Sequence, residues 1–91
     1  LGRMEELHFS PLITSISPDI VSSNSIISIS GKHFGYDQGT SQARFENGAV
    51  CEIISWSNTS VTCRVPQGAQ TGLVKVITEG GASNGVLVTV E

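Results

Sequence analysis

The chain has 91 residues and a formal net charge of −3, so it has room for one domain with one hydrophobic core. Hydrophobic residues make up 38% of it and charged residues 14%, whereas an average domain carries roughly 25% charged residues. Lys and Arg are few and scattered along an acidic chain. Because phosphate binding depends on clustered basic side chains, a nucleic-acid partner is not expected.

The chain starts with a short mixed segment, LGRMEELHFS, that contains an internal methionine. We interpret residues 1–10 as a linker or an expression-derived leader and residues 11–91 as the domain proper. The leader lacks the apolar core of a signal peptide. No run in the sequence approaches the ~20 apolar residues that a membrane-spanning helix needs, so direct membrane insertion is not expected.

Two strands are predicted at the start of the domain. In PLITSIS the apolar positions are Ile13 and, less regularly, Leu12 and Ile16, and a Pro-Asp turn follows. In SIISISG, Ile27 and Ile29 fall on one face of a strand, because successive side chains of a strand point to opposite sides. Both segments therefore predict one face turned toward a core and one turned toward water.

The remaining strands follow at similar spacing. SQARFENG alternates Ala43 and Phe45 with polar residues and ends at an Asn-Gly turn. CEIISWSNTSVTC supplies two strands, and GLVKVITEGG and GVLVTVE alternate valines with other residues. No segment keeps the helical spacing of apolar residues for three turns. The pattern predicts an all-β fold of about seven strands in two packed antiparallel sheets.

The segment CEIISWSNTSVTC contains both cysteines and the only tryptophan. Pairing Ile53 with Val61 in a hairpin places Cys51 directly opposite Cys63 and leaves WSN as the loop, with Asn58 in a left-handed conformation. Direct opposition brings the two cysteine Cα atoms to about 4.5–5.5 Å, within the range of a disulfide. A shift by two residues makes the cysteines diagonal neighbours about 7–8 Å apart, outside that range.

Two interpretations of Cys51 and Cys63 remain open. They form a cross-strand disulfide, which would stabilise the fold by at most about 3 kcal/mol and would indicate an oxidising compartment, or they fill core space as reduced thiols. Zinc binding is not expected, because the spacing lacks paired C-x-x-C ligands and His8 and His33 add no supporting spacing.

Other candidate sites for chemistry are weak. The glycine-rich GKHFGYDQG lacks the phosphate-binding P-loop pattern. Glu46, Glu52 and Glu79 fall at solvent-facing strand positions or turns, where a carboxylate is simply solvated. Asp19 and Asp37 lack a ligand-dense calcium loop. We therefore expect no catalytic residue, no bound cofactor and no metal site.

Trp56 and Tyr36 are the aromatic residues that the strand pattern does not commit to the core. Both are candidates for glycan contact, because sugars stack on exposed aromatic rings; alternatively, Trp56 folds over the sandwich edge to bury its large apolar area. Asn58 starts the N-glycosylation sequon NTS at a predicted turn, so it is a candidate glycan acceptor.

Residues 11–91 resemble a known family in three segments whose order and spacing agree. These are SISP at the end of the first strand, GKHFG at the close of the second, and SWSNTSVTCRVPQGAQTG leading to GGASNG. Together they resemble the IPT/TIG family, the immunoglobulin-like domain named for plexins and transcription factors. The resemblance implies an immunoglobulin-like sandwich of the E-set type. The cysteine pair flanking the hairpin is similar to that of extracellular members, whose repeats often carry a bridge there.

The resemblance also implies binding or spacing and not catalysis. The leading hypothesis is a non-enzymatic module of a larger extracellular or cell-surface protein, acting as a spacer or binding a protein partner or neighbouring domains of the same chain. The alternative is an accessory domain of a secreted polysaccharide-acting enzyme, in which Trp56 and Tyr36 would contact glycan. The third interpretation, a dimerisation domain of a transcription factor, is disfavoured by the charge and the cysteines.

Overall fold

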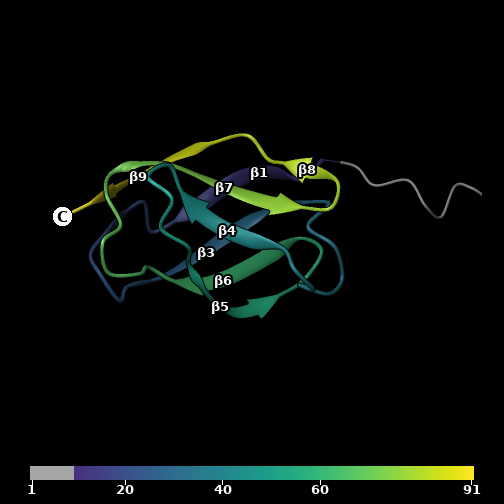
Figure 1. Ribbon diagram of the computed structural model, residues 1–91, viewed down its shortest axis with the longest axis horizontal. Helices are drawn as coiled ribbons and strands as arrows, with labels where there is room; N and C mark the ends of the chain where they lie inside the picture. Colours follow the sequence, from purple (N-terminus) through teal and green to yellow (C-terminus); the bar gives the residue numbers. More distant parts are fainter. Residues whose placement is uncertain (1–9) are drawn as a thin grey trace, which may run out of the picture.

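The computed structural model describes residues 10–91 as two β-sheets packed face to face (Figure 1). Residues 1–9, most of the predicted leader, lie outside the described part of the chain. One sheet has the strand order β1-β3-β6-β5, and the other has the order β2-β9-β7-β4, with β8 paired to β7. The strands are β1 (Leu12–Ser17), β2 (Ile20–Val21), β3 (Ile26–Lys32), β4 (Gln42–Phe45), β5 (Glu52–Trp56), β6 (Ser60–Arg64), β7 (Gly72–Thr78), β8 (Gly81–Ala82) and β9 (Val86–Val90). No helix occurs in the described residues, so the predicted all-β sandwich is confirmed.

The core fills the space between the two sheets with alternating side chains from each strand. The largest fully buried side chains are Phe34, Phe45, Ile27, Ile29, Val61, Val65, Val74, Val76, Val88 and Cys63. Burying one aliphatic or aromatic side chain of this kind contributes about 1.5–3 kcal/mol. The inward faces predicted for SIISISG, SQARFENG and GLVKVITEGG are therefore confirmed.

Two short strands were not predicted. β2 and β8 have two residues each, too few for an alternating pattern to be detected in the sequence. β2 pairs with β9 in parallel, with Ile20 opposite Thr89, which is an exception to the predicted antiparallel pairing. β1 has an irregularity between Ile13 and Ser15, and this explains why its buried residues, Ile13 and Ile16, are three positions apart and do not alternate.

A side-chain clasp joins the first strand of one sheet to the segment between β8 and β9 of the other. The Ile13 N–H donates to Asn84 Oδ1 at 2.8 Å, and Asn84 Nδ2 donates to the Ile13 carbonyl at 3.0 Å. The buried Ser83 accepts a hydrogen bond from the Val76 N–H at 2.9 Å and donates one to the Asn84 carbonyl at 2.8 Å. Asn84 thus satisfies the backbone of β1 where its ladder is irregular.

The two ends of the described chain lie at opposite ends of the sandwich. Ser10 Oγ donates to the carbonyl of Gly80, just beyond the end of β7, at 3.1 Å. The Val90 N–H donates to Oγ1 of Thr71, just before the start of β7, at 2.8 Å. Figure 1 shows the same arrangement, with the C-terminus at one end and β8 toward the other. The two ends of the described chain are therefore separated by the length of β7.

Candidate functional site: a polar groove at one end of the sandwich

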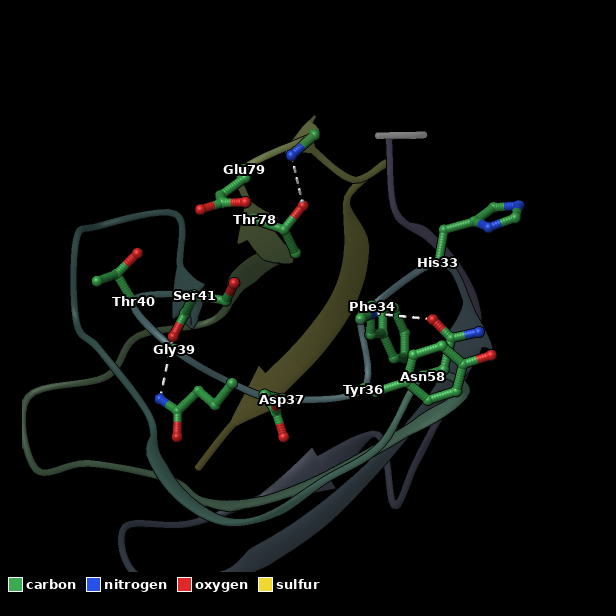
Figure 2. A pocket seen from close by; sticks show the side chains of 13 residues that line it. His33, Phe34, Tyr36, Asp37, Gly39, Thr40, Ser41, Asn58, Thr78 and Glu79 are labelled. Carbon is green, nitrogen blue, oxygen red and sulfur yellow. Dashed lines mark hydrogen bonds between the residues drawn. The ribbon is translucent and has the colours of Figure 1, made fainter. Parts of the chain in front are cut away.

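A groove of about 640 Å³ opens at the end of the sandwich where β3 leads into β4 and β7 turns into β8. It is lined by the loop of residues 33–41, by Asn58 from the β5–β6 turn and by residues 78–80. In Figure 2, Tyr36 and Asn58 lie on one side of the groove, and Thr40 and Ser41 lie on the other. Its volume is in the range typical of small-molecule sites, roughly 300–1,000 Å³.

The loop begins with a backbone turn that the local sequence requires. A side chain at Gly31 would collide with the carbonyl oxygen of Leu12 and would come within 2.7 Å of the Phe34 ring, so only glycine fits at this point. His33 then adopts a left-handed conformation with φ of 65°. This turn directs Phe34 into the core, where it is 1% exposed, while Lys32 and His33 remain exposed.

Trp56 supports the loop from behind. Its indole N–H is shared between the carbonyl oxygens of Phe34, at 3.2 Å, and Gly35, at 3.0 Å. The two rings make an edge-to-face contact with centroids 6.3 Å apart. Trp56 is half-buried and packs against the hydrophobic core, which matches the alternative that it folds over the sandwich edge. A direct contact between Trp56 and a ligand stays a prediction.

Asn58 holds the same two loop residues from the β5–β6 turn. Its backbone carbonyl accepts a hydrogen bond from the Phe34 N–H at 3.0 Å, and its Oδ1 accepts one from the Gly35 N–H at 2.9 Å. Asn58 is not left-handed, and the loop is residues 57–59, not the predicted WSN, because Trp56 belongs to β5. Asn58 is half-buried, and its Oδ1 makes the hydrogen bond to the loop. An N-linked glycan would be attached to Nδ2, which does not take part in that bond, so glycosylation of Asn58 stays a prediction.

Tyr36 follows these anchored residues and projects into water. It is 84% exposed, and it lines the groove together with Asp37. On the far side of the loop, Ser41 is buried and its N–H donates to the Gln38 carbonyl at 2.8 Å. Gln38 Nε2 donates in return to the Ser41 carbonyl at 3.0 Å. The exposed segment around Tyr36 is thus held at both ends.

Most of the residues that line the groove carry polar side chains, and two of them are acidic. Asp37 and Glu79 are exposed carboxylates, Thr78 accepts a hydrogen bond from the Gly80 N–H at 3.0 Å, and the lining contains no Lys or Arg. In the part of the chain that the structure describes, no group of three or more His, Cys, Asp or Glu side chains could hold a metal ion. In the sequence, Glu79 and Asp37 are isolated charges, and nothing in the pattern indicates that the fold brings their loops to one groove.

The hairpin that carries the cysteines has a different register from the predicted one. Ile53 pairs with Cys63, not with Val61, and a bulge follows between Ile53 and Ser55. Cys51 lies just before β5, so it is a diagonal neighbour of Cys63 and not its direct partner. The predicted register is wrong by two residues at Ile53, because the turn lies later in the chain than predicted, with Trp56 paired to Val61, and the bulge then shifts the pairing by one residue.

The predicted disulfide between Cys51 and Cys63 is not formed in this structure, in which both are buried free thiols. The two side chains share a hydrogen bond. This bond and burial raise the pKa of the Cys63 thiol, while the same bond lowers the pKa of Cys51. Formation of the bridge under oxidising conditions stays a prediction. Because both thiols are buried in the core, they take no part in the groove.

The whole of the sandwich matches one family. The model of the IPT/TIG domain matches residues 11–90. The chain belongs to the IPT/TIG family. The match agrees with the predicted family.

The chain is similar to parts of much longer proteins. The chain is 39% identical over 57 residues to the cyclomaltodextrin glucanotransferase of Bacillus sp. (strain 1-1), a match that covers 63% of this chain and 8% of that enzyme. The structure of the γ-CGTase from alkalophilic Bacillus clarkii superposes with a TM-score of 0.81 at 21% identity, over 93% of this chain and 13% of that one. An auxiliary nutrient binding protein from Bacteroides thetaiotaomicron superposes with a TM-score of 0.79 at 18% identity, over 90% of this chain and 21% of that one. The two structural similarities show the fold, and the chain spans only a small part of each relative.

Proposed function

We propose that the chain is a non-catalytic accessory module of a larger extracellular protein that acts on or binds polysaccharide, and that it serves there as a rigid spacer. The observation that carries this proposal is the match to a cyclomaltodextrin glucanotransferase, of which it covers only 8%. That enzyme is named for a glucan substrate. Polysaccharides are too large to enter a cell, which supports an extracellular location. Residues 10–91 contain no helix long and apolar enough to cross a membrane.

The position of the chain ends supports a spacer. Ser10 is tied to one end of β7 and Val90 to the other, so the module sets neighbouring segments apart by about the length of a strand and its turns, at roughly 3.3 Å per residue. Ser10 and Val90 are each hydrogen-bonded to residues next to the ends of β7, so both ends of the domain are anchored to the sandwich. A module of this kind would hold the domains on either side of it at a fixed distance from each other.

The outer faces of the two sheets differ in a way that supports packing against a neighbouring domain. The β2-β9-β7-β4 sheet exposes Ile20, Leu73 and Leu87, at 57%, 37% and 58%, and Leu73 lies directly opposite Leu87. The other sheet also exposes Leu12, Ile26 and Ile54, at 44%, 50% and 48%. None of these three lies directly opposite another apolar side chain, because Leu12 pairs with Lys32, Ile26 pairs with Arg64 and Ile54 lies in the bulge of β5. Hydroxyl side chains lie among them, for example Ser28 opposite Thr62. Exposed apolar side chains in adjacent positions favour contact with protein, so a neighbouring domain would pack on the first face.

The buried thiols support a non-catalytic role. Cys51 and Cys63 are 3% and 0% exposed, so neither sulfur atom is accessible to a substrate in the folded domain. Asp37 and Glu79, the carboxylates of the groove, are exposed to solvent.

A distance measurement tests the spacer. Spin labels at Ser10→Cys and Glu91→Cys, with the buried native thiols left unlabelled, are expected to give one narrow distance distribution by double electron–electron resonance. In parallel, the purified chain is expected to release no product from soluble starch or cyclomaltodextrin. A broad distribution would contradict the spacer, and turnover that persists through purification would contradict the non-catalytic role.

A further inference from the structure

We propose that the groove binds a neutral oligosaccharide, with Tyr36 as the stacking platform. This inference deepens the proposed function and rests on it, because it names the ligand class that an accessory module of a polysaccharide-acting protein would hold. The starting observation is the exposure of Tyr36. At 84% it is the most exposed large hydrophobic side chain in the described residues, where the others lie between 37% and 58%.

The platform is rigid although the side chain is exposed. Phe34 and Gly35, which directly precede Tyr36, are held by hydrogen bonds with Trp56 and Asn58 at 2.9–3.2 Å. The reciprocal hydrogen bonds between Gln38 and Ser41 close the loop on its other side. A loop that is already ordered loses little conformational entropy when a ligand binds, so more of the contact energy contributes to the affinity.

The charge of the lining selects against anions. Asp37 and Glu79 contribute negative charge, and no Lys or Arg lines the groove. His33 also belongs to the lining, but its ring points away from Asp37 and Glu79 (Figure 2). Phosphates, nucleic acids and acidic glycans would be repelled by these carboxylates, because like charges at short range are unfavourable. The ligand class that remains is neutral or cationic.

A neutral sugar fits the remaining features better than a cation does. Organic cations are held by cages of several aromatic rings, whereas the groove offers only the ring of Tyr36 as an exposed aromatic surface. A pyranose ring has an apolar C–H face that packs on a flat aromatic ring and a rim of hydroxyl groups that donate hydrogen bonds. The carboxylates of Asp37 and Glu79 and the hydroxyl groups of Thr40 and Thr78 are acceptors for that rim.

The test is a titration of the ¹⁵N-labelled 91-residue chain, followed by NMR, with maltoheptaose, cellohexaose and xylohexaose as separate probes. We expect saturable shifts in residues 33–41 and 78–80 with at least one of them. Tyr36→Ala is expected to raise the Kd about tenfold, whereas Tyr36→Phe, which keeps the ring, is expected to leave it within about twofold. Leu87→Ala, on the outer face of the sheet, is the matched exposed control and leaves the Kd unchanged.

Several results would overturn this inference. They are the absence of saturable shifts with all three oligosaccharides, shifts that Tyr36→Ala leaves unchanged, and tighter binding of tetramethylammonium or inorganic phosphate at the same residues. These outcomes leave the spacer proposal intact, because the distance between labels at Ser10 and Glu91 does not depend on a ligand. A broad distance distribution, in turn, would remove the spacer without touching the titration.

Discussion

The interior of the sandwich and its grooved end use the same loop for opposite purposes. Phe34 is 1% exposed and Tyr36 is 84% exposed, although a single glycine separates them. Phe34 packs in the interior and stabilises the fold. Tyr36 is exposed to solvent at the grooved end, on a backbone segment that is anchored by the packing of Phe34. The difference shows that a surface site in a small domain is positioned by the core beneath it.

Phe34→Ala makes the largest expected change in this comparison. Removing a fully buried aromatic ring leaves a cavity, so we expect the free energy of unfolding to fall by about 3–5 kcal/mol. That is a large part of the 5–15 kcal/mol available to a typical domain. Urea denaturation followed by tryptophan fluorescence measures it. A loss below about 1 kcal/mol would mean that the ring is not packed as described.

Oxidation of the cysteine pair tests the interior by adding a covalent bond, whereas Phe34→Ala removes packing. In the presence of oxidised glutathione, Cys51 and Cys63 are expected to form a bridge, seen as a loss of two hydrogens in the intact mass. The gain in stability is expected to stay below about 3 kcal/mol, because the observed diagonal register must adjust before the sulfur atoms bond. Two thiols that still react with a maleimide in denaturant after oxidation would contradict the prediction.

Asn84→Ala tests whether the clasp at the grooved end contributes as much as core packing. The substitution leaves the N–H and the carbonyl of Ile13 without their partner, so we expect a loss of about 2–3 kcal/mol in urea denaturation. Asn84→Asp is the matched variant, because it keeps the acceptor and loses only the donor. An equal loss in both variants would contradict the assignment of two separate hydrogen bonds.

Trp56→Phe tests whether the indole N–H anchors the loop between the interior and the groove. The variant keeps an aromatic ring against Phe34 and removes the N–H that is shared between the carbonyls of Phe34 and Gly35. We expect a loss of about 1 kcal/mol and faster hydrogen exchange at the amides of residues 34–36. Unchanged exchange there would show that the indole does not hold the loop.

Tyr36→Ala makes the smallest expected change. A residue with 84% of its surface exposed loses almost no packing when it is truncated, so the urea midpoint should correspond to a change within about 0.5 kcal/mol. The contrast with Phe34→Ala is the direct test of the comparison. A loss above about 1.5 kcal/mol would place Tyr36 among the packed residues.

The strand pattern could be predicted from the sequence, but the pairing within it could not. The inward faces with Ile27, Ile29 and Val74 follow from alternation, since a buried face of a strand needs an apolar residue at every second position. The later position of the β5–β6 turn and the bulge after Ile53 leave no signature in the composition of β5, so the register of the cysteine hairpin was missed. The groove was predicted only as an exposed Tyr36, without the residues that surround it.

The sequence by itself determined the all-β class, the faces of the principal strands and the family, because these depend on the local order of residue types along the chain. The tertiary structure alone decided that Trp56 supports a loop while Tyr36 is exposed, that Cys51 lies diagonal to Cys63, and that residues 33–41, Asn58 and residues 78–80 meet in one groove. The physical reason is that these outcomes depend on contacts between segments far apart in sequence. Such contacts form only when the two sheets close on a common core.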